Sequence, residues 1–235
     1  MFRSIETTFP DHSQLQYRLA LVAYHSGRYL YAYRAKKPWQ APTSEVYLVL
    51  RAGMVLPPEE HTQLVRDYIA AADALPRPKR DNARVVLNGS FCEQPPLGLI
   101  KSIELAGCYI VDDDFMLVTR WLLDDVPANG NPLEELSKAF LHRSATTAAK
   151  YDTHREEKGV FLLKQIKTSG AEGVIFAAPS FCDPALLERP MLQDVLSKNK
   201  VPHTAFKYAE NTGQMAPIRE QAGTFADSIK LWSAA

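Results

Sequence analysis

Two of the three cysteines in this 235-residue chain occur in the same short phrase. Cys92 lies in Ser-Phe-Cys-Glu, residues 90–93, and Cys182 lies in Ser-Phe-Cys-Asp, residues 180–183. Each phrase falls between an apolar run typical of a strand and a segment with helical periodicity. A cysteine at a helix N-terminus sits in a positive dipole field that lowers the pKa of its thiol. Thiolate is the form that soft metals and iron–sulfur clusters bind, so both residues are candidate ligands.

Other interpretations of these thiols stay open on residue type alone. Cys182 could also be a small buried apolar side chain, or a nucleophile paired with a histidine. Cys108 begins an apolar run instead of following one, so we expect it to be buried at the opposite edge of the same sheet. The sequence has no C-x-x-C, H-E-x-x-H or G-x-S-x-G motif, which leaves zinc and serine hydrolysis without support.

The elements that would position these cysteines alternate along the chain. Apolar runs predict strands, and apolar periodicity predicts helices between them, which is the pattern of a parallel sheet with helices on both faces. We therefore predict an α/β fold in residues 83–235, an open, doubly wound, mostly parallel sheet that binds the cluster and the substrate. A helical extension and linker in residues 1–82 precedes it. Strands are expected at residues 84–89, 108–111, 173–177 and 203–208, and helices at 59–75, 96–106, 115–123, 132–142, 154–168, 184–198 and 217–232.

Polar residues follow the second and fourth predicted strands. Ligands of open α/β sheets gather beyond the carboxyl ends of the strands. Residues 112–114, all aspartate, and the loop that contains Glu210, Asn211 and Gln214 would lie there. They could bond a substrate carbonyl, a phosphate-bearing cofactor or a proton relay, or they could cap the next helix. Because the loop also precedes a helix N-terminus, we predict that Glu210, Asn211 and Gln214 contact the substrate.

Composition excludes several classes of function. Lys+Arg and Asp+Glu both number 27, and this balance argues against a general nucleic-acid-binding protein. The basic run at residues 77–80 is interpreted as a solvated linker. No apolar stretch approaches the roughly 18 residues of a membrane span, and residues 1–11 do not resemble a secretory signal. Three cysteines form no disulfide framework, so a cytoplasmic protein without membrane or nucleic-acid partners is expected.

Several separate blocks of the sequence resemble the 2-hydroxyacyl-CoA dehydratase and benzoyl-CoA reductase family. The resemblance extends from about residue 30 to the C-terminus. Arg120, residues 107–114 and residues 211–232 are similar to the benzoyl-CoA reductase branch in particular. The family blocks are Ala-Ala-Pro-Ser-Phe-Cys-Asp-Pro at 177–184, Pro-Met-Leu-Gln at 190–193, Val-Pro at 201–202 and Asn-Thr-Gly-Gln at 211–214.

This resemblance implies a catalytic subunit of the smaller, cluster-carrying type. It implies a [4Fe-4S] cluster with Cys182 as a ligand, and Cys92 is a second ligand by position only. The implied partners are a paralogous catalytic subunit, two ATP-hydrolysing electron-activating subunits, and ferredoxin as the electron source. The implied reaction dearomatises benzoyl-CoA to a cyclohexadiene-carbonyl-CoA, so the enzyme would be an oxidoreductase that acts on CH–CH groups with an iron–sulfur donor.

Two alternatives to this function remain. One is a component of a 2-hydroxyacyl-CoA dehydratase, and the other is a truncated, non-catalytic family remnant. Members of the family resembled begin with another α/β domain that supplies further cluster cysteines, and residues 1–28 do not resemble it. We therefore expect this chain to lack that domain and to have no activity alone.

Overall fold

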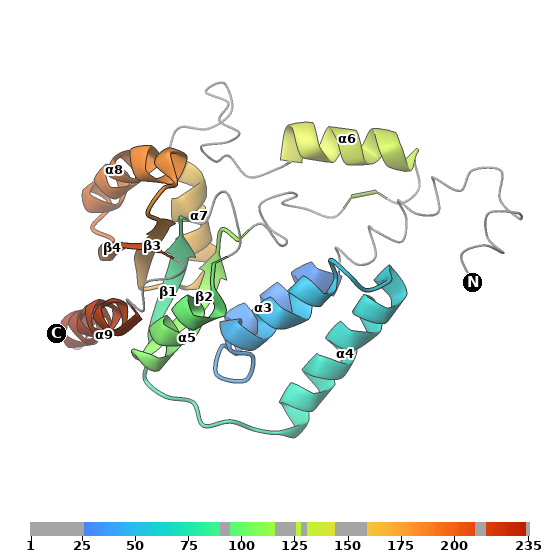
Figure 1. Ribbon diagram of the computed structural model, residues 1–235, viewed down its shortest axis with the longest axis horizontal. Coiled ribbons are helices and arrows are strands. Elements are labelled where there is room, and N and C mark those ends of the chain that lie inside the picture. Colours follow the sequence, from blue (N-terminus) through green and yellow to red (C-terminus); the bar gives the residue numbers. More distant parts are fainter. Residues whose placement is uncertain are drawn as a thin grey trace, which may run out of the picture.

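The core of the protein is a parallel sheet (Figure 1). The computed structural model describes residues 26–89, 95–115, 126–127, 131–143, 159–209 and 215–233. Within them, four strands lie in the order β2-β1-β3-β4, so β1 is paired on both sides and β2 and β4 form the edges. The strands are β1 (Ala83–Asn88), β2 (Cys108–Asp113), β3 (Gly173–Pro179) and β4 (His203–Tyr208). The predicted α/β fold is confirmed.

Helices cover both faces of this sheet, as Figure 1 shows. One face packs against α5 (Leu97–Leu105) and α9 (Met215–Ser233), and the other against α7 (Val160–Ser169) and α8 (Asp183–Lys198). Successive side chains of a strand point to opposite faces, so a strand covered on both sides must be apolar throughout. β3 meets this requirement, since its first six residues are all buried. The first face receives Val85, Leu87, Ile175 and Ala177, and the second receives Val86, Val174 and Phe176.

The chain turns sharply between the end of α7 and the start of β3. Gly170 follows the last residue of α7 with φ +63, a left-handed conformation that glycine adopts without a side-chain clash. At the start of α8, Pro184 occupies the first turn, where its missing N–H has no helical partner to lose. These signals place the two helices close to their predicted bounds, although residues 154–158 of the expected α7 lie outside the described residues.

Three helical segments precede the sheet and form a layer of their own. Residues 26–36 are helical, and α3 (Thr43–Ala52) and α4 (Pro58–Ala74) follow. Pro42 and Pro57 stand at the N-caps of α3 and α4, where proline starts a helix but cannot continue one. The three segments share a small apolar core of Leu30, Tyr31, Ala41, Val46, Leu50 and Val65.

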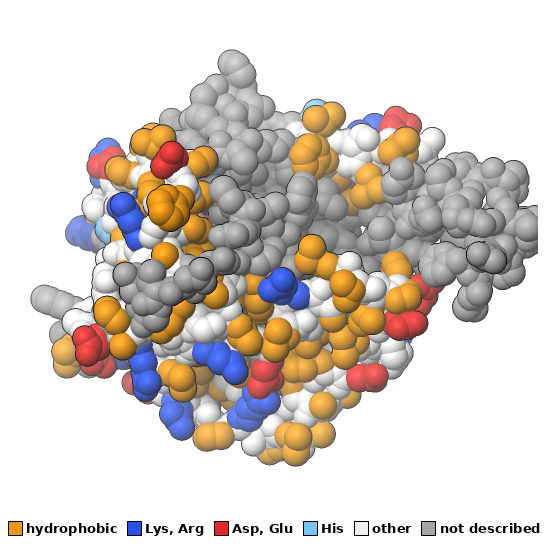
Figure 2. Space-filling model, viewed as in Figure 1, with side chains coloured by type: hydrophobic (Ala, Val, Ile, Leu, Met, Phe, Trp, Pro, Cys, Tyr) orange, Lys and Arg blue, Asp and Glu red, His pale blue; other side chains and the backbone are white. Residues whose placement is uncertain are grey.

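The helical layer packs directly against the β2 side of the sheet. The Thr43 hydroxyl donates to the Ile110 carbonyl at 2.8 Å, and the Thr43 amide donates to the Glu104 carboxylate at 2.6 Å. Tyr47 belongs to the main core and meets Phe115 edge to face, with ring centroids 5.7 Å apart. The division at residue 82 stays a prediction. Figure 2 shows hydrophobic side chains at the surface of this layer. Leu48, Met54 and Val55 are among its exposed residues.

One further helix, α6 (Pro132–Arg143), lies apart from the sheet in Figure 1. It agrees with the helix predicted at residues 132–142, and its Ala139 packs on Val126. The helix predicted at residues 115–123 falls almost entirely outside the described residues. In the part of the chain that the structure describes, no helix combines the length and apolar content that crossing a membrane requires.

Candidate functional site

The carboxyl ends of the four strands meet at one edge of the sheet, where an open α/β fold binds its ligands. Cys182 follows β3 at this edge. The other predicted site residues, Cys92, Glu210, Asn211 and Gln214, lie outside the described residues, as does most of each loop that carries them. The structure therefore places their loops by the residues on either side, and their roles stay predictions.

Cys182 is the N-cap residue of α8. Its amide donates to the Pro179 carbonyl at 3.0 Å, which closes a tight turn after β3, and its carbonyl accepts from the Leu186 amide at 3.0 Å to begin the helix. The sequence favours this geometry because Pro184, two positions after Cys182, is well suited to the first turn of a helix. The residue thus lies at the positive end of a 16-residue helix.

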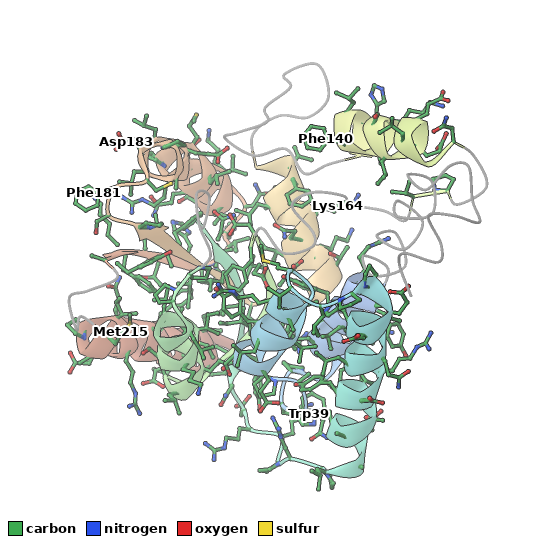
Figure 3. The ribbon with its side chains drawn as sticks, turned by 45° about the vertical axis from the view of Figure 1, so that its right-hand side comes forward. Trp39, Phe140, Lys164, Phe181, Asp183 and Met215 are labelled. Atoms are coloured by element: carbon green, nitrogen blue, oxygen red, sulfur yellow. The ribbon has the colours of Figure 1, made fainter. Side chains whose placement is uncertain are left out.

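The surroundings of Cys182 are apolar. The residue is 3% exposed and packs with Ala178, Ala185 and Leu186. The preceding residue, Phe181, is 94% exposed and projects away from the sheet in Figure 3. This environment suits a cluster ligand shielded from water and also suits a small buried apolar residue, so both interpretations remain.

The possible metal ligands near Cys182 determine whether the described residues could bind a complete cluster. A [4Fe-4S] cluster takes mostly four thiolate ligands. Among the described residues, no three His, Cys, Asp or Glu side chains stand close enough together to hold a metal ion. Cys182 fits the part of one ligand, and a complete set would need donors from the remainder of this chain or from another chain.

The loop that carries Cys92 leaves β1 alongside β3. Gly89, the residue after β1, has φ +124, and a Cβ at this position would lie 2.8 Å from the Ala177 carbonyl oxygen. Its amide donates to both carboxylate oxygens of Asp114, each at 3.0 Å. The glycine therefore lets the end of β1 approach β3 closely at Ala177, five residues before Cys182 in the sequence. This arrangement brings the starts of the two cysteine loops to neighbouring strands.

The loop that carries Glu210, Asn211 and Gln214 begins beside the Cys182 turn. The amide and hydroxyl of Ser180 both donate to the Tyr208 carbonyl, at 2.8 and 3.0 Å. Tyr208 is the last residue of β4, so these bonds tie the turn after β3 to the start of the loop after β4. Sequence reasoning missed this contact, although the Ser-Phe-Cys phrase contained its donor.

Cys108 lies at the other edge of the sheet, as predicted. It is 1% exposed, and its sulfur lies 3.9 Å from the Ala222 carbonyl of α9. Burial, and then the negative charge of Asp227, raise the pKa of this thiol to about 12. A thiol in this state is a poor ligand and a poor nucleophile at neutral pH.

An ion pair that the sequence does not reveal anchors the end of β2. The Arg34 guanidinium donates to Asp113 at 2.5 Å, and both side chains are almost completely buried. The Tyr31 hydroxyl donates to the other oxygen of Asp113 at 2.9 Å. Asp113, the last residue of β2, thus binds the helical layer, and Asp114, the next residue, binds Gly89 at the end of β1. No periodicity or motif links Arg34 to Asp113, so only the structure could identify the pair.

Asp112, beside this ion pair, can exchange a proton near neutral pH. Burial, and then the neighbouring charge of Asp113, raise its pKa to about 7. The charge of Arg34 and a hydrogen bond from Gln165 of α7 oppose the shift. A carboxyl group with such a pKa can serve as an acid or a base at the carboxyl edge.

Fold and site together define an open parallel α/β protein with a candidate cysteine ligand at its carboxyl edge. Residues 24–229 match the model of the family described as 2-hydroxyglutaryl-CoA dehydratase, D-component, and the chain belongs to this family. The resemblance seen in the sequence is thereby confirmed.

Three relatives show how the family relates to this chain. A benzoyl-CoA reductase subunit of Thauera aromatica is 63% identical over 220 residues, which are 92% of this chain and 57% of the relative. The (R)-phenyllactyl-CoA dehydratase beta subunit of Clostridium sporogenes is 26% identical over 80% of this chain and 49% of its own length. The (R)-2-hydroxyglutaryl-CoA dehydratase beta subunit of Acidaminococcus fermentans is 27% identical over 80% of this chain and 50% of its own length. The chain spans about half the length of these curated relatives.

Proposed function

We propose that this chain is a subunit of an ATP-dependent, ferredoxin-fed reductase that dearomatises benzoyl-CoA to a cyclohexadiene-carbonyl-CoA. The observation that carries the proposal is the contrast in identity, 63% with a benzoyl-CoA reductase subunit against 26% and 27% with two dehydratase subunits. The enzyme would be an oxidoreductase that acts on CH–CH groups. Its partners would be a paralogous catalytic subunit, ATP-hydrolysing electron-activating subunits and ferredoxin, all in the cytoplasm.

In this proposal Cys182 is one ligand of a [4Fe-4S] cluster and Cys92 is a second. When bound, the cluster supplies single electrons at low potential. Cys182 directly precedes the first turn of α8, and its apolar neighbours Ala178 and Ala185 keep water away from it. The close approach of Gly89 to β3 supports the pairing, because it starts the Cys92 loop next to the strand that ends at Cys182.

The loop after β4 would hold the acyl end of the substrate. Glu210, Asn211 and Gln214 supply side chains able to bond a thioester carbonyl, and they directly precede α9, which begins at Met215. The two Ser180 bonds to Tyr208 support this assignment, since they start that loop beside the Cys182 turn. Asp112, whose pKa is about 7, could supply a proton at the same edge.

A dehydratase component is the second candidate function. The family description and the two dehydratase beta subunits among the relatives favour it. The same thiolate position and substrate loop would then support removal of water from a 2-hydroxyacyl-CoA. A non-catalytic family remnant would keep the fold without a functional cluster.

Turnover by an assembled complex separates these functions. The chain is combined anaerobically with the paralogous and electron-activating subunits, ATP and reduced ferredoxin, and is offered benzoyl-CoA or (R)-phenyllactyl-CoA. We expect ATP-dependent loss of the aromatic absorbance of benzoyl-CoA and no dehydration of the second substrate. Dehydration alone would establish the second function. An equal rate in a mixture without this chain would identify it as a remnant.

A further inference from the structure

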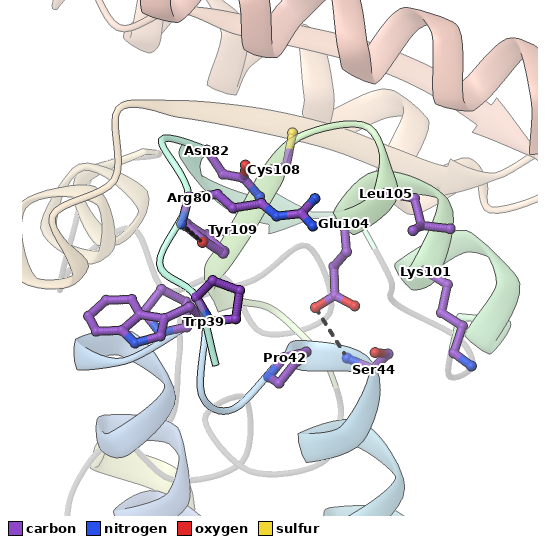
Figure 4. A pocket seen from close by; sticks show the side chains of 12 residues that line it. Trp39, Pro42, Ser44, Arg80, Asn82, Lys101, Glu104, Leu105, Cys108 and Tyr109 are labelled. Carbon is purple, nitrogen blue, oxygen red and sulfur yellow. Dashed lines mark hydrogen bonds between the residues drawn. The ribbon is translucent and has the colours of Figure 1, made fainter. Parts of the chain in front are cut away.

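A cavity of about 440 Å³ opens at the amino edge of the sheet (Figure 4). Cys182 follows β3 and lies at the opposite, carboxyl edge. Its walls come from three segments that are distant in the sequence: the turn before α3, the linker before β1, and the end of α5 with the start of β2. A volume of this size lies in the range of small-molecule sites. The proposed reductase function makes no use of this cavity.

Flat aromatic rings line one side of the cavity. Trp39 and Tyr109 both contribute to it, and Figure 4 shows them on the side opposite Lys101 and Leu105. The ammonium group of Lys79 lies 5.0 Å from the centroid of the Trp39 ring, a cation–π distance. A planar ligand ring could stack on these surfaces, and a positive charge would already be next to it.

The polar groups around the cavity are mainly donors. Arg80 and Lys101 line it, and within the described residues neither side chain forms an ion pair. The Tyr109 hydroxyl accepts from the Arg80 amide at 2.9 Å, and its own proton can still be donated. Asn82 adds an amide. A ligand that satisfies these groups must carry acceptors and negative charge.

The carboxylate in the cavity wall is already engaged. Glu104 accepts from the amides of Thr43 at 2.6 Å and Ser44 at 3.4 Å, the second of which is drawn in Figure 4. It therefore caps the N-terminus of α3 and does not pair with the cavity cations. Arg80 and Lys101 in the lining, with Lys79 close to the Trp39 ring, remain to attract a ligand, and several cations favour a multiply charged phosphate over a single carboxylate.

We propose that this cavity binds an adenine nucleotide, with the ring on Trp39 and the phosphates toward Arg80 and Lys101. A free nucleotide and the nucleotide end of coenzyme A share this chemistry. The basic run at residues 77–80 then has a role beyond that of a linker, because Arg80 brings its charge to the cavity. Binding of a free nucleotide does not depend on the reductase function, whereas binding of the coenzyme A end of a substrate rests on it.

Calorimetric titration of the full 235-residue chain tests the proposal with three probes: ADP, coenzyme A and inorganic phosphate. We expect ADP, coenzyme A or both to bind at least about tenfold more tightly than phosphate, because only they carry the ring. Binding of both supports a free nucleotide, and binding of coenzyme A alone supports the thioester. Equal affinity for phosphate would reduce the cavity to a nonspecific anion site, and no binding of any probe would refute the proposal.

Two variants and a matched control locate the binding. Trp39→Leu and Lys101→Gln should each weaken nucleotide binding about tenfold, through the lost ring surface and the lost charge. Lys167→Gln removes an equivalent exposed lysine from α7, on the other side of the sheet, and should leave affinity unchanged. Circular dichroism confirms folding of each variant, and Lys101→Gln remains informative if Trp39→Leu fails to fold, because Lys101 is exposed. Unchanged affinity in Lys101→Gln, or an equal loss in Lys167→Gln, would contradict the proposal.

Discussion

At the carboxyl edge of the sheet, Cys182 is the N-cap residue of α8. At the amino edge, Cys108 is the first residue of β2 and contacts α9. Both residues are buried to a similar degree, with exposures of 3% and 1%, so burial does not distinguish them. Their positions in the fold do. Cys182 lies between the end of β3 and the start of α8, whereas Cys108 lies at the start of β2, where burial and then Asp227 raise the pKa of its thiol to about 12. Position within the βα unit, more than exposure, therefore separates a candidate ligand from a core thiol.

The largest effect is expected from Cys182→Ser in the assembled, anaerobic complex. A hydroxyl is a poor ligand for iron, so one cluster signal in electron paramagnetic resonance should be lost or altered. Reductase activity should fall on the order of a hundredfold or more, since changing a group that only supports a metal ligand already costs about 10- to 100-fold.

Cys108→Ser is the matched control for this change. It should leave the cluster signal intact and lower the free energy of unfolding by about 1–3 kcal/mol, because it buries a hydroxyl where a thiol packed. The difference between the two edges would be disproved by equal effects of the two variants on the cluster signal. Iron content and a thermal melt of each variant provide both readings.

The loss of the buried ion pair at the end of β2 should give the next largest effect, a decrease in the free energy of unfolding. Arg34→Met leaves Asp113 buried without its cation and should lower the free energy of unfolding by about 3–5 kcal/mol. Lys37→Met, in the same helical layer, breaks a pair with Asp73 in which both side chains are about half exposed. It should cost less than about 1 kcal/mol. Urea unfolding compares the two, and similar losses would show that the Arg34 pair does not anchor the carboxyl edge.

The close approach of β1 to β3 predicts a smaller loss. Gly89→Ala places a Cβ 2.8 Å from the Ala177 carbonyl oxygen in a backbone with φ +124. We expect a destabilisation of about 1–3 kcal/mol from this strain. Gly98→Ala has open space around the new methyl group and lies in α5, so it should gain up to about 1 kcal/mol. If Gly89→Ala left the free energy of unfolding unchanged, the close approach of β1 to β3 at this residue would not hold the starts of the two cysteine loops together.

The last effect is the dependence of folding stability on pH through Asp112. Asp112 has a folded-state pKa of about 7, above its usual value near 3.8. The folded protein therefore binds this proton more tightly than the unfolded chain, and the stability that results is lost as the pH rises from about 4 to about 7. Asp112→Asn removes the titration, so its stability relative to the wild type should increase from pH 5 to pH 8 by on the order of 2 kcal/mol. Parallel pH profiles of the two proteins would contradict this assignment.

Local patterns were sufficient to predict the strands and most of the helices. β4 has its predicted bounds, and α8 begins one residue before its predicted start, because continuous apolar runs and Pro184 each act within a few residues. β2 and β3 extend two residues beyond their predicted ends, since pairing with neighbouring strands continues through Asp113 and Pro179. Such pairing is a tertiary effect that no single segment records.

The site was predictable only where one segment carries it. Cys182 could be placed at the start of α8 because strand, turn and helix adjoin in the sequence. Arg34 and Asp113 stand 79 positions apart, and their pairing depends on how the helical layer docks. The nucleotide cavity likewise joins three separate segments, and composition alone led us to interpret its Arg80 as part of a solvated linker.

The strand order also affects how this protein folds while it is being synthesised on the ribosome. β1 pairs with β2 soon after both are synthesised, but its other partner, β3, follows about ninety residues later in the sequence. At common rates of translation the nascent chain would wait on the order of ten seconds for β3, with one side of β1 unpaired. An unpaired apolar strand edge invites pairing with other chains. Chaperone contact during this interval, and not after release, is therefore the protection that this topology calls for.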